Sequence, residues 1–407
     1  MQVDSRIKYF GLGVFVIMAV FEVGHIHPDE YFQLIEFAQY QLGKASADDL
    51  PWEFHEKMRP TIQVWMVCGI IKALDFLHVE NPFTITLILR LISAVFYWAV
   101  ISRFNVLLSD RHFPDGGFSK VFHLGSYLVW FVPFANSHFS SESLSATVLL
   151  LGLYPLIEEP SGRRMLLWSG LFLALSFLTR YQTGIAVAGG YLWLLMVARV
   201  PFARIAGSGA LFIVVVLLGS CLDGLFYGEP VFAPWNYLKQ NLIEGRASDF
   251  GTDPWHFYFT RFVHAGPVIA IPLLVFFARG LVGLRNHLFV WVIVPFVLVH
   301  LLISHKEMRF LFPVIYPLLF VSLHGVCSDF QERKIRRYHV LLAKPLLGLN
   351  LVRILLVMAS PDKIVTNYKY LYENLEEGDG NIISIGKCYY DEMGHLRSTF
   401  YTPEGAN

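Results

Sequence analysis

Long apolar runs recur along almost the whole chain, and they constrain its fold more than any other feature. Of its 407 residues, 55% are hydrophobic and only 16% are charged, whereas soluble domains carry about 25% charged residues. Many separate runs reach or approach the ~17–25 residues that span a bilayer as a helix. The sequence therefore predicts an all-α polytopic membrane protein. The formal net charge is zero and no basic tract occurs, so nothing indicates a nucleic-acid partner.

The distribution of Lys and Arg predicts how the chain threads the membrane. Short cytoplasmic loops are enriched in these residues, and the N-terminal segment carries Arg6 and Lys8. We predict about 11 crossings. The predicted spans are 8–24, 84–102, 121–136, 143–158, 164–180, 184–199, 206–224, 263–279, 286–303, 309–327 and 344–360. They place the basic loops inside only if the apolar segment 61–78 does not cross, and its Lys72 and Asp75 suit an interfacial helix.

The same threading predicts the domain organisation. Residues 1–360 are expected to form one transmembrane domain with long external loops at 25–83 and 223–262. The first loop is expected to contain helices that lie on the membrane surface. Residues 361–407 form a short polar tail on the same extracytoplasmic side, with a strand predicted at 381–386.

The most polar tetrapeptide, HPDE, directly follows the first apolar run. Pro28 restricts the backbone and would hold Asp29 against the membrane surface. A carboxylate in a half-dry cleft can act as a general base toward a hydroxyl group. The alternative is that Asp29 or Glu30 caps a helix that begins near Tyr31. Both interpretations can hold, each for a different member of the acidic pair.

Further polar residues collect on the same predicted side. Glu142 begins the fourth span, Arg180 ends the fifth, and His305, Lys306 and Arg309 lie together in the segment SHKEMR. Clustered cations at this position would bind a phosphate whose lipid chain stays in the bilayer. The alternative is that these side chains only snorkel to lipid headgroups.

The second long loop combines aromatic side chains with amides and a lysine, a combination suited to sugar binding. An aromatic belt at the membrane interface would explain the same aromatic residues. The loop contains no DxD-like spacing and no Gly-rich phosphate loop, which argues against a soluble nucleotide donor. The candidates in this loop are Trp235, Asn236, Lys239, Asn241 and Trp255.

Four ordered blocks carry a resemblance to a known family. They are HPDEYFQ, SESLSATVLLLGLY, LDGLFYGEPVFAPWNYLKQN with FGTDPWHFY, and SHKEMRFLFPVIYPLL. Together they resemble the dolichyl-phosphate-mannose-dependent α-mannosyltransferases of glycosyltransferase family 22. The resemblance implies a GT-C fold and an inverting transfer of mannose from a polyprenyl-phosphate-mannose donor. It implies that the acceptor is a hydroxyl of a lipid-linked or cell-surface glycan on the extracytoplasmic side of the membrane.

The resemblance also implies roles for individual residues. Asp29 would be the general base, and Glu30 would position the substrate or the base. His305, Lys306 and Arg309 would stabilise the leaving phosphate, and the scheme requires no metal and no cofactor. The predicted substrate contacts are His27, Glu142, Arg180, Trp235, Asn236, Lys239, Asn241 and Trp255.

The chain is shorter than the eukaryotic members of this family, chiefly in its C-terminal part. This length favours a bacterial relative in the inner membrane, with the endoplasmic reticulum membrane as the eukaryotic alternative. Two other functions stay open. The first is a GT-C enzyme that transfers a different sugar, and the second is a lipid or solute transporter whose outer charges form a gate.

Overall fold

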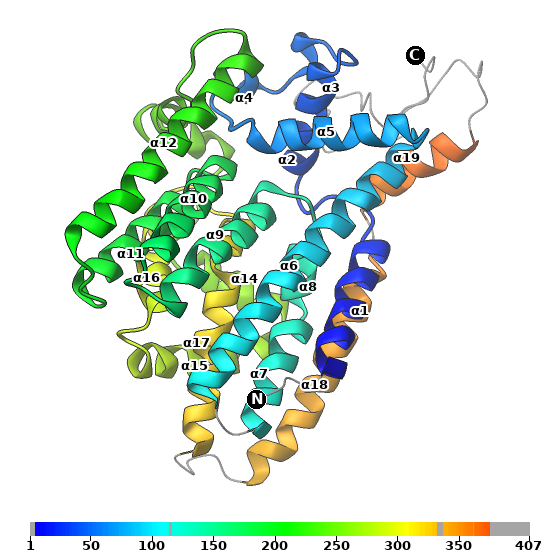
Figure 1. Ribbon diagram of the computed structural model, residues 1–407. Helices are drawn as coiled ribbons and strands as arrows, with labels where there is room; N and C mark the ends of the chain where they lie inside the picture. The colour runs from blue at the N-terminus through cyan, green and yellow to red at the C-terminus, as the bar shows by residue number, and fades with distance from the viewer. Residues whose placement is uncertain (1–4, 114–115, 332–336, 361, 375–407) are drawn as a thin grey trace.

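The computed structural model describes residues 5–113, 116–331, 337–360 and 362–374, and every regular element in these ranges is a helix (Figure 1). The predicted all-α class is therefore confirmed for the described part of the chain. The strand predicted at 381–386 lies outside the described residues. The long helices are α1 (Ser5–Phe21), α5 (Ile62–Phe76), α6 (Pro82–His112), α7 (Gly116–Leu128), α9 (Ser141–Glu158), α10 (Arg163–Thr179), α11 (Thr183–Met196), α12 (Phe202–Tyr227), α15 (Pro267–Gly283), α16 (Leu288–Leu302), α17 (Ile315–Gln331) and α18 (Arg337–Met358).

The helix bounds follow the predicted apolar runs, with two informative differences. Helix α6 continues to His112, whereas the apolar run was predicted to end at 102. Polar residues such as Asn105 end the apolar run without ending the helix, because the backbone hydrogen bonds continue through them. The run 121–136 is divided between α7 and α8 (Phe131–Asn136). The break falls at residues 129–130, where Pro133 lacks the N–H that would otherwise donate to the carbonyl oxygen of Val129.

Three stretches of the described chain are long and apolar enough to cross a membrane. They are Pro82–His112, Phe202–Tyr227 and Met308–Ser328, and four shorter apolar helices accompany them. With 31 residues, α6 is about 46 Å long, so it exceeds the ~30 Å hydrocarbon core of a bilayer. The count of about 11 crossings stays a prediction.

Close helix contacts in the bundle depend on glycine. Helices α15 and α17 pack over most of their length, and Gly280 and Gly325 lie at their contact. A Cβ at Gly280 would stand 2.0 Å from the carbonyl oxygen of Val321, and one at Gly325 would stand 2.1 Å from that of Phe276. Small residues allow this approach of two backbones, which is a common packing mode of membrane helices.

The segment between α1 and α6 forms a separate helical layer at the end of the bundle opposite the N-terminus (Figure 1). It contains α2 (Pro28–Glu30), the π-helix η1 (Tyr31–Glu36), α3 (Phe37–Gln41) and α4 (Trp52–His55), and α5 lies crosswise to α6. A small apolar core joins this layer to the bundle, because Phe37 and Val64 pack with Phe226 of α12 and Phe139. Whether α5 lies in the membrane interface stays a prediction.

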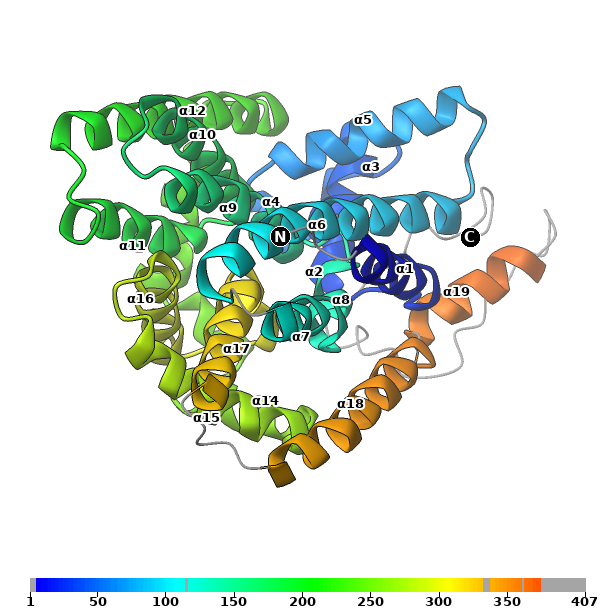
Figure 2. The ribbon, with the colours of Figure 1, turned by 60° about the horizontal axis from the view of Figure 1, so that its bottom comes forward.

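Figure 2 shows how the remaining helices are grouped. Helices α1, α6 and α7 lie between the group α9–α12 on one side and α18 on the other. The main apolar core is formed by α1, α6, α7, α9, α10, α11, α16 and α17. The helical layer that contains the HPDE segment therefore lies at one end of this packed bundle of helices.

Gly24 makes the turn from α1 into the HPDE segment. Its φ is 130°, a conformation that other residues rarely adopt. A Cβ at this position would stand 2.2 Å from the Cβ of Asp362, whose N–H donates to the carbonyl oxygen of Val23 at 2.9 Å. The predicted tail 361–407 thus begins beside the first loop and continues as α19 (Lys363–Asn374). Residues 361 and 375–407 lie outside the described residues.

Candidate functional site

The HPDE segment begins a helix, and its histidine is the cap. The Nδ1 atom of His27 accepts a hydrogen bond from the Asp29 N–H at 3.2 Å, and Pro28 occupies the first helical position. The expectation of a helix that begins near Tyr31 with an acidic cap is therefore wrong. The helix begins at Pro28 and runs directly into η1, and such π-helical turns occur frequently at functional sites.

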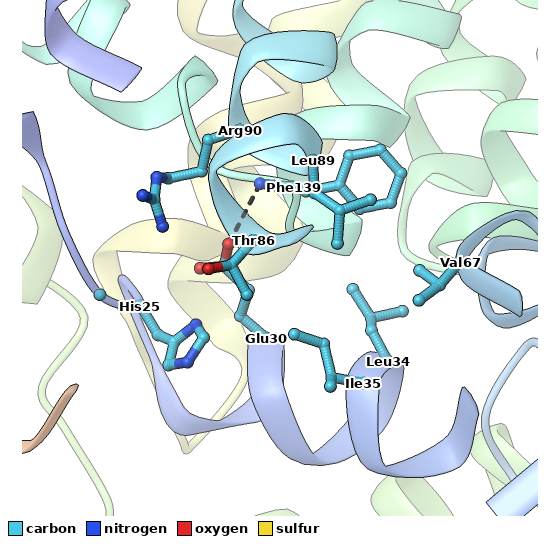
Figure 3. Close-up of a pocket in the computed structure, with 10 residues that line it drawn as sticks. His25, Glu30, Leu34, Ile35, Val67, Thr86, Leu89, Arg90 and Phe139 are labelled. Carbon is cyan, nitrogen blue, oxygen red and sulfur yellow. Dashed lines mark hydrogen bonds between the residues drawn. The ribbon is translucent and has the colours of Figure 1, made fainter. Parts of the chain in front are cut away.

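Glu30 fastens this helix to the bundle. Its carboxylate accepts the N–H of Ile26 at 3.1 Å and the N–H of Phe139, also at 3.1 Å (Figure 3). Burial would raise the pKa of Glu30, but His138, 3.2 Å away, together with His25 and the Ile26 N–H outweighs burial and brings the pKa to about 2. Glu30 is thus a buried, ionised carboxylate that holds two backbone segments together.

A small cavity lies behind Glu30. Figure 3 shows His25 and Arg90 on one side of it and the apolar side chains of Leu34, Ile35 and Val67 on the other. The lining of this cavity does not include Asp29. The two neighbouring acids therefore face different surroundings.

Asp29 faces a guanidinium that three carboxylates share. Arg309, in the 3-10 helix η5 (Met308–Val314), donates through Nη2 to Asp29 Oδ2 at 2.7 Å and through Nη1 to Glu142 Oε1 at 2.8 Å. It also donates to both carboxylate oxygens of Glu307, at 2.5 Å from Nε and 3.0 Å from Nη2. Asp29 and Arg309, which are 280 positions apart in the sequence, thus make a direct ion pair.

Two more side chains complete the cluster. Nη1 of Arg180 lies 2.8 Å from Glu142 Oε1 and donates to Ser141 Oγ at 3.1 Å. Nε2 of His27 lies 3.4 Å from Glu307 Oε2. We refer to these residues as the charged network, which consists of His27, Asp29, Glu142, Arg180, Glu307 and Arg309.

The charged network keeps the carboxylates of Asp29 and Glu307 ionised. Burial would raise the pKa of Asp29, but Arg309 and then His27 hold it well below the ordinary value for aspartate. Burial would also raise the pKa of Glu307, but the hydrogen bonds and charge of Arg309, together with His27 and His305, bring it to about 2. The side chain of Asp29 is 25% exposed, so an incoming hydroxyl group can reach an ionised carboxylate.

The other two predicted phosphate ligands lie beside the network and bind the second long loop. Nζ of Lys306 donates to the carbonyl oxygens of Asp253, at 2.8 Å, and Ile303. Nε2 of His305 lies 3.0 Å from Glu307, and its Nδ1 lies 3.2 Å from the carbonyl oxygen of Gly251. Both side chains therefore connect the segment that precedes η5 to the loop 223–262.

The predicted sugar ligands of the second loop do not join the charged network. Trp235 and Trp255 are 53% and 66% exposed. Asn236 donates to the carbonyl oxygens of Glu56 and Lys57 at 3.3 and 3.2 Å, which ties the two long loops together. Lys239 pairs with Glu244 at 3.2 Å, and Asn241 donates to the carbonyl oxygen of Tyr237 at 3.0 Å. Their role in substrate binding stays a prediction.

The structure adds residues that the sequence analysis did not assign to the site. Glu307 stands inside the SHKEMR segment, so its motif could have pointed to it. Arg59 and Gln63 line a recess beside Arg180, but they lie in an ordinary loop and an apolar helix, where no local pattern indicates a site. In the described part of the chain, no group of three or more His, Cys, Asp or Glu side chains is arranged to hold a metal ion.

Comparison with known proteins gives one family for nearly the whole chain. The family model of the Alg9-like mannosyltransferase family matches residues 8–379. The chain is 28% identical over 292 residues to GPI alpha-1,2-mannosyltransferase 3 of Xenopus laevis, which is 71% of this chain and 54% of that protein. It is 28% identical over 347 residues to GPI mannosyltransferase 3 of Yarrowia lipolytica, covering 80% of this chain and 64% of the relative.

The chain is similar to a human protein over a comparable share of its length. The chain is 26% identical over 299 residues to GPI alpha-1,2-mannosyltransferase 3 of Homo sapiens, with 71% of this chain and 51% of the relative covered. The chain therefore spans less than two thirds of the length of each of these relatives. No solved structure matches the chain.

Proposed function

The chain belongs to the Alg9-like mannosyltransferase family, and from this premise we propose that it is an inverting glycosyltransferase. It transfers mannose from a polyprenyl-phosphate-mannose donor to a hydroxyl of a lipid-linked or cell-surface glycan. The reaction takes place on the extracytoplasmic side of the membrane, within a GT-C fold. The donor and the acceptor both carry lipid, which suits a site at one end of a bundle of apolar helices.

One observation carries the proposal, namely the direct contact between Asp29 and Arg309 at 2.7 Å. Inverting transfer needs a base for the acceptor hydroxyl and positive charge near the departing phosphate. HPDE and SHKEMR supply these two kinds of group from segments whose Asp29 and Arg309 are 280 positions apart in the sequence. The fold brings both segments into one network, which supports their joint use in a single reaction.

The reaction follows from this arrangement in one displacement. Asp29 accepts the proton of the acceptor hydroxyl, and the hydroxyl oxygen forms a bond to the anomeric carbon of mannose. The bond between that carbon and the phosphate oxygen breaks, and its electron pair leaves with the polyprenyl phosphate. The configuration at the anomeric carbon inverts, and Asp29 later returns its proton to solvent.

The other members of the network position Asp29. Because Arg309 lowers the pKa of Asp29, the carboxylate is ionised before the substrate arrives, but it is also a weak base. A substrate that draws Arg309 away from Asp29 raises the pKa of this carboxylate and strengthens it as a base. Glu307 holds Arg309 through two hydrogen bonds and limits how far the guanidinium can move.

The names of the relatives suggest which acceptor to test first. The three compared proteins are named GPI mannosyltransferase 3 or GPI alpha-1,2-mannosyltransferase 3. We therefore propose a mannose-bearing glycolipid of the GPI type as the first acceptor, with an α-1,2 linkage as the expected product. Donors with other sugars form the comparison set.

A transfer assay with the purified full chain tests the function. The protein is incubated with polyprenyl-phosphate-mannose and a panel of glycolipid and free glycan acceptors, with nucleotide-activated mannose as the control donor. We expect product only from the lipid donor, with an inverted anomeric configuration. Product from the nucleotide donor, retained configuration, or lipid movement across vesicles without any transfer would each refute the proposal.

A further inference from the structure

A polar recess opens beside the charged network. It is lined by segments far apart in sequence, and with its open mouth it encloses about 370 Å³ of empty space. Tyr237, on α13 (Ala233–Leu238), forms one wall, and the Arg59 guanidinium carbon lies 5.9 Å from the centre of its ring. The polar side chains of the lining are Gln33, Arg59, Gln63, Ser141, Thr179, Arg180, Tyr181, Gln182 and Tyr237.

Several buried polar atoms on the lining residues have no hydrogen-bond partner in the described part of the chain, and three of them belong to side chains that bind anions or hydroxyl groups. These three are Nε of Arg59, Nε of Arg180 and Oε1 of Gln63. A buried unpaired polar group costs roughly 1–3 kcal/mol, and more if it is charged. Arg180 is only 5% exposed, so solvent compensates little of this cost. Two N–H donors and one acceptor in the same recess match a ligand that carries anionic oxygens and a hydroxyl group.

Arg59 and Arg180 differ from Arg309 in the number of carboxylates that they contact. Arg309 contacts three carboxylates, from Asp29, Glu142 and Glu307. Each arginine of the recess has one carboxylate partner, which is Glu53 at 3.2 Å for Arg59 and Glu142 at 2.8 Å for Arg180. An incoming anion therefore meets less competition in the recess than at Arg309.

Helix α13 also presents apolar side chains on the surface of the chain. Trp235 and Leu238 of this helix are exposed, and so are Leu242 and Ile243 in the π-helix η3 (Lys239–Ile243) that continues it. The opposite face binds the first loop, where Gln240 donates to Glu56 at 2.7 Å. A ligand in the recess thus lies next to a surface that suits an alkyl chain.

We propose that this recess binds the phosphate of the lipid-linked sugar donor. The guanidinium groups of Arg59 and Arg180 donate to the phosphate oxygens, and Oε1 of Gln63 accepts from a sugar hydroxyl. Arg309, which shares Glu142 with Arg180, holds Asp29 and adds positive charge on the side of the phosphate that faces this base. This inference rests on the proposed function, since it names the part of the site that holds the donor.

Direct binding tests the recess without relying on catalysis. Farnesyl phosphate, farnesol and inorganic phosphate are titrated against the purified full chain in lipid nanodiscs. We expect wild type to bind farnesyl phosphate at least tenfold more tightly than either of the other two probes. Arg59→Gln and Arg180→Gln should each weaken farnesyl phosphate about 10- to 100-fold, the range for a lost hydrogen bond to a charged group.

Three further variants keep the test decisive. Arg59→Lys retains a charge opposite Glu53, so it should fold normally and still weaken farnesyl phosphate, because lysine cannot reproduce the guanidinium contacts. Gln63→Leu should weaken mannosyl farnesyl phosphate and leave farnesyl phosphate unchanged. Arg246→Gln removes an exposed arginine of the second loop that does not line the recess, and it should bind both lipids as wild type does.

The outcomes also separate this inference from the proposed function. If farnesyl phosphate binds through Arg59 but no sugar is transferred, the assignment of the recess is supported and the proposed transfer reaction is refuted. If transfer proceeds but Arg59→Lys changes neither the KM for the donor nor the affinity for farnesyl phosphate, the assignment of the recess is refuted. Equal affinity for inorganic phosphate and farnesyl phosphate would refute a site built for lipid phosphate.

Discussion

Two groups of polar side chains in this bundle differ in the residues that form them and in the elements that contribute those residues. The charged network joins loops and helix ends and consists of ionisable residues. The second group, which we term the neutral network, lies between α6, α7 and α17. It consists of Ser102, Asn105, Ser109, His123, Ser126, Tyr127 and Tyr316.

The neutral network pairs its members across helices. Asn105 is fully buried, donates to Ser126 Oγ at 2.6 Å and accepts from the Tyr316 hydroxyl at 2.8 Å. Ser102 and Tyr127 share a hydrogen bond of 2.9 Å. Such interhelical hydrogen bonds stabilise the packing of membrane helices and need no ligand.

The charged network carries a different cost. Two guanidinium groups meet three carboxylates there. Each network has one buried nitrogen without a hydrogen-bond partner among the described residues, Nε of Arg180 here and Nδ1 of His123 in the neutral network. Buried ion pairs contribute little net stability, because the loss of hydration offsets their attraction. The comparison teaches that buried polarity alone does not indicate a reaction centre. Charge and loop origin together are what set the charged network apart.

The strongest test of this contrast replaces the proposed base. Asp29→Asn should lower mannose transfer by about 10²- to 10⁴-fold, the usual contribution of a general base. Because Arg309 keeps Glu142 and Glu307 as partners, the protein should still fold, with a moderate decrease in melting temperature. Transfer rates and melting curves in detergent check both statements.

Asp48→Asn is the matched control, since it makes the same change at an exposed position of the same loop. It should transfer mannose at the wild-type rate. Wild-type turnover by Asp29→Asn would end the assignment of the base.

The next largest effect is expected from Arg309→Lys. Lysine keeps the charge but cannot hold Asp29, Glu142 and Glu307 at once, so kcat/KM should fall about 10- to 100-fold. A looser cation lowers the pKa of Asp29 less, so the acid limb of the pH profile should move to higher pH. The dependence of kcat/KM on pH measures this shift. An unchanged acid limb would show that Arg309 does not control Asp29.

The neutral network should affect stability and leave the chemistry intact. Asn105→Leu removes the acceptor of the Tyr316 hydroxyl and one of the two hydrogen bonds of Ser126, which should destabilise the protein by about 1–3 kcal/mol. Transfer per folded molecule, measured well below the melting temperature, should stay near wild type.

Val106→Leu is the control for this variant, because Val106 lies on the exposed side of the same helix. It should melt like wild type. A loss of transfer in folded Asn105→Leu comparable to that of Asp29→Asn would remove the distinction between the two networks.

The smallest effect concerns acid stability. The pKa values of Glu30 and Glu307 are about 2, below the ordinary glutamate value of 4.5. Depressed carboxyl pKa values stabilise the fold at pH values above the unfolded pKa, and this contribution is lost as pH falls through the folded pKa. Through these two groups, the melting temperature should decline as pH falls from about 4.5 toward 2.

Two variants show which network causes this decline. Glu307→Gln should make the slope shallower, whereas Asn105→Leu should shift the whole curve down by a similar amount at each pH. Melting curves recorded across this range provide the measurement. The same slope in Glu307→Gln as in wild type would contradict the role of Glu307.

The sequence by itself determined the helical class, most helix positions and the ordered motifs that lead to the family. These properties depend on local patterns, because apolar runs and short motifs are contiguous in the chain. HPDE and SHKEMR were visible as candidate segments for the same reason.

Only the tertiary structure decided how the polar residues divide their tasks. Adjacent residues such as Asp29 and Glu30 received different surroundings, since Asp29 faces Arg309 and Glu30 binds the Phe139 N–H. Arg59 and Gln63 gained significance only through the recess that they share with Arg180. Burial, pairing and pKa depend on neighbours that are distant in the chain, and no local pattern encodes those neighbours.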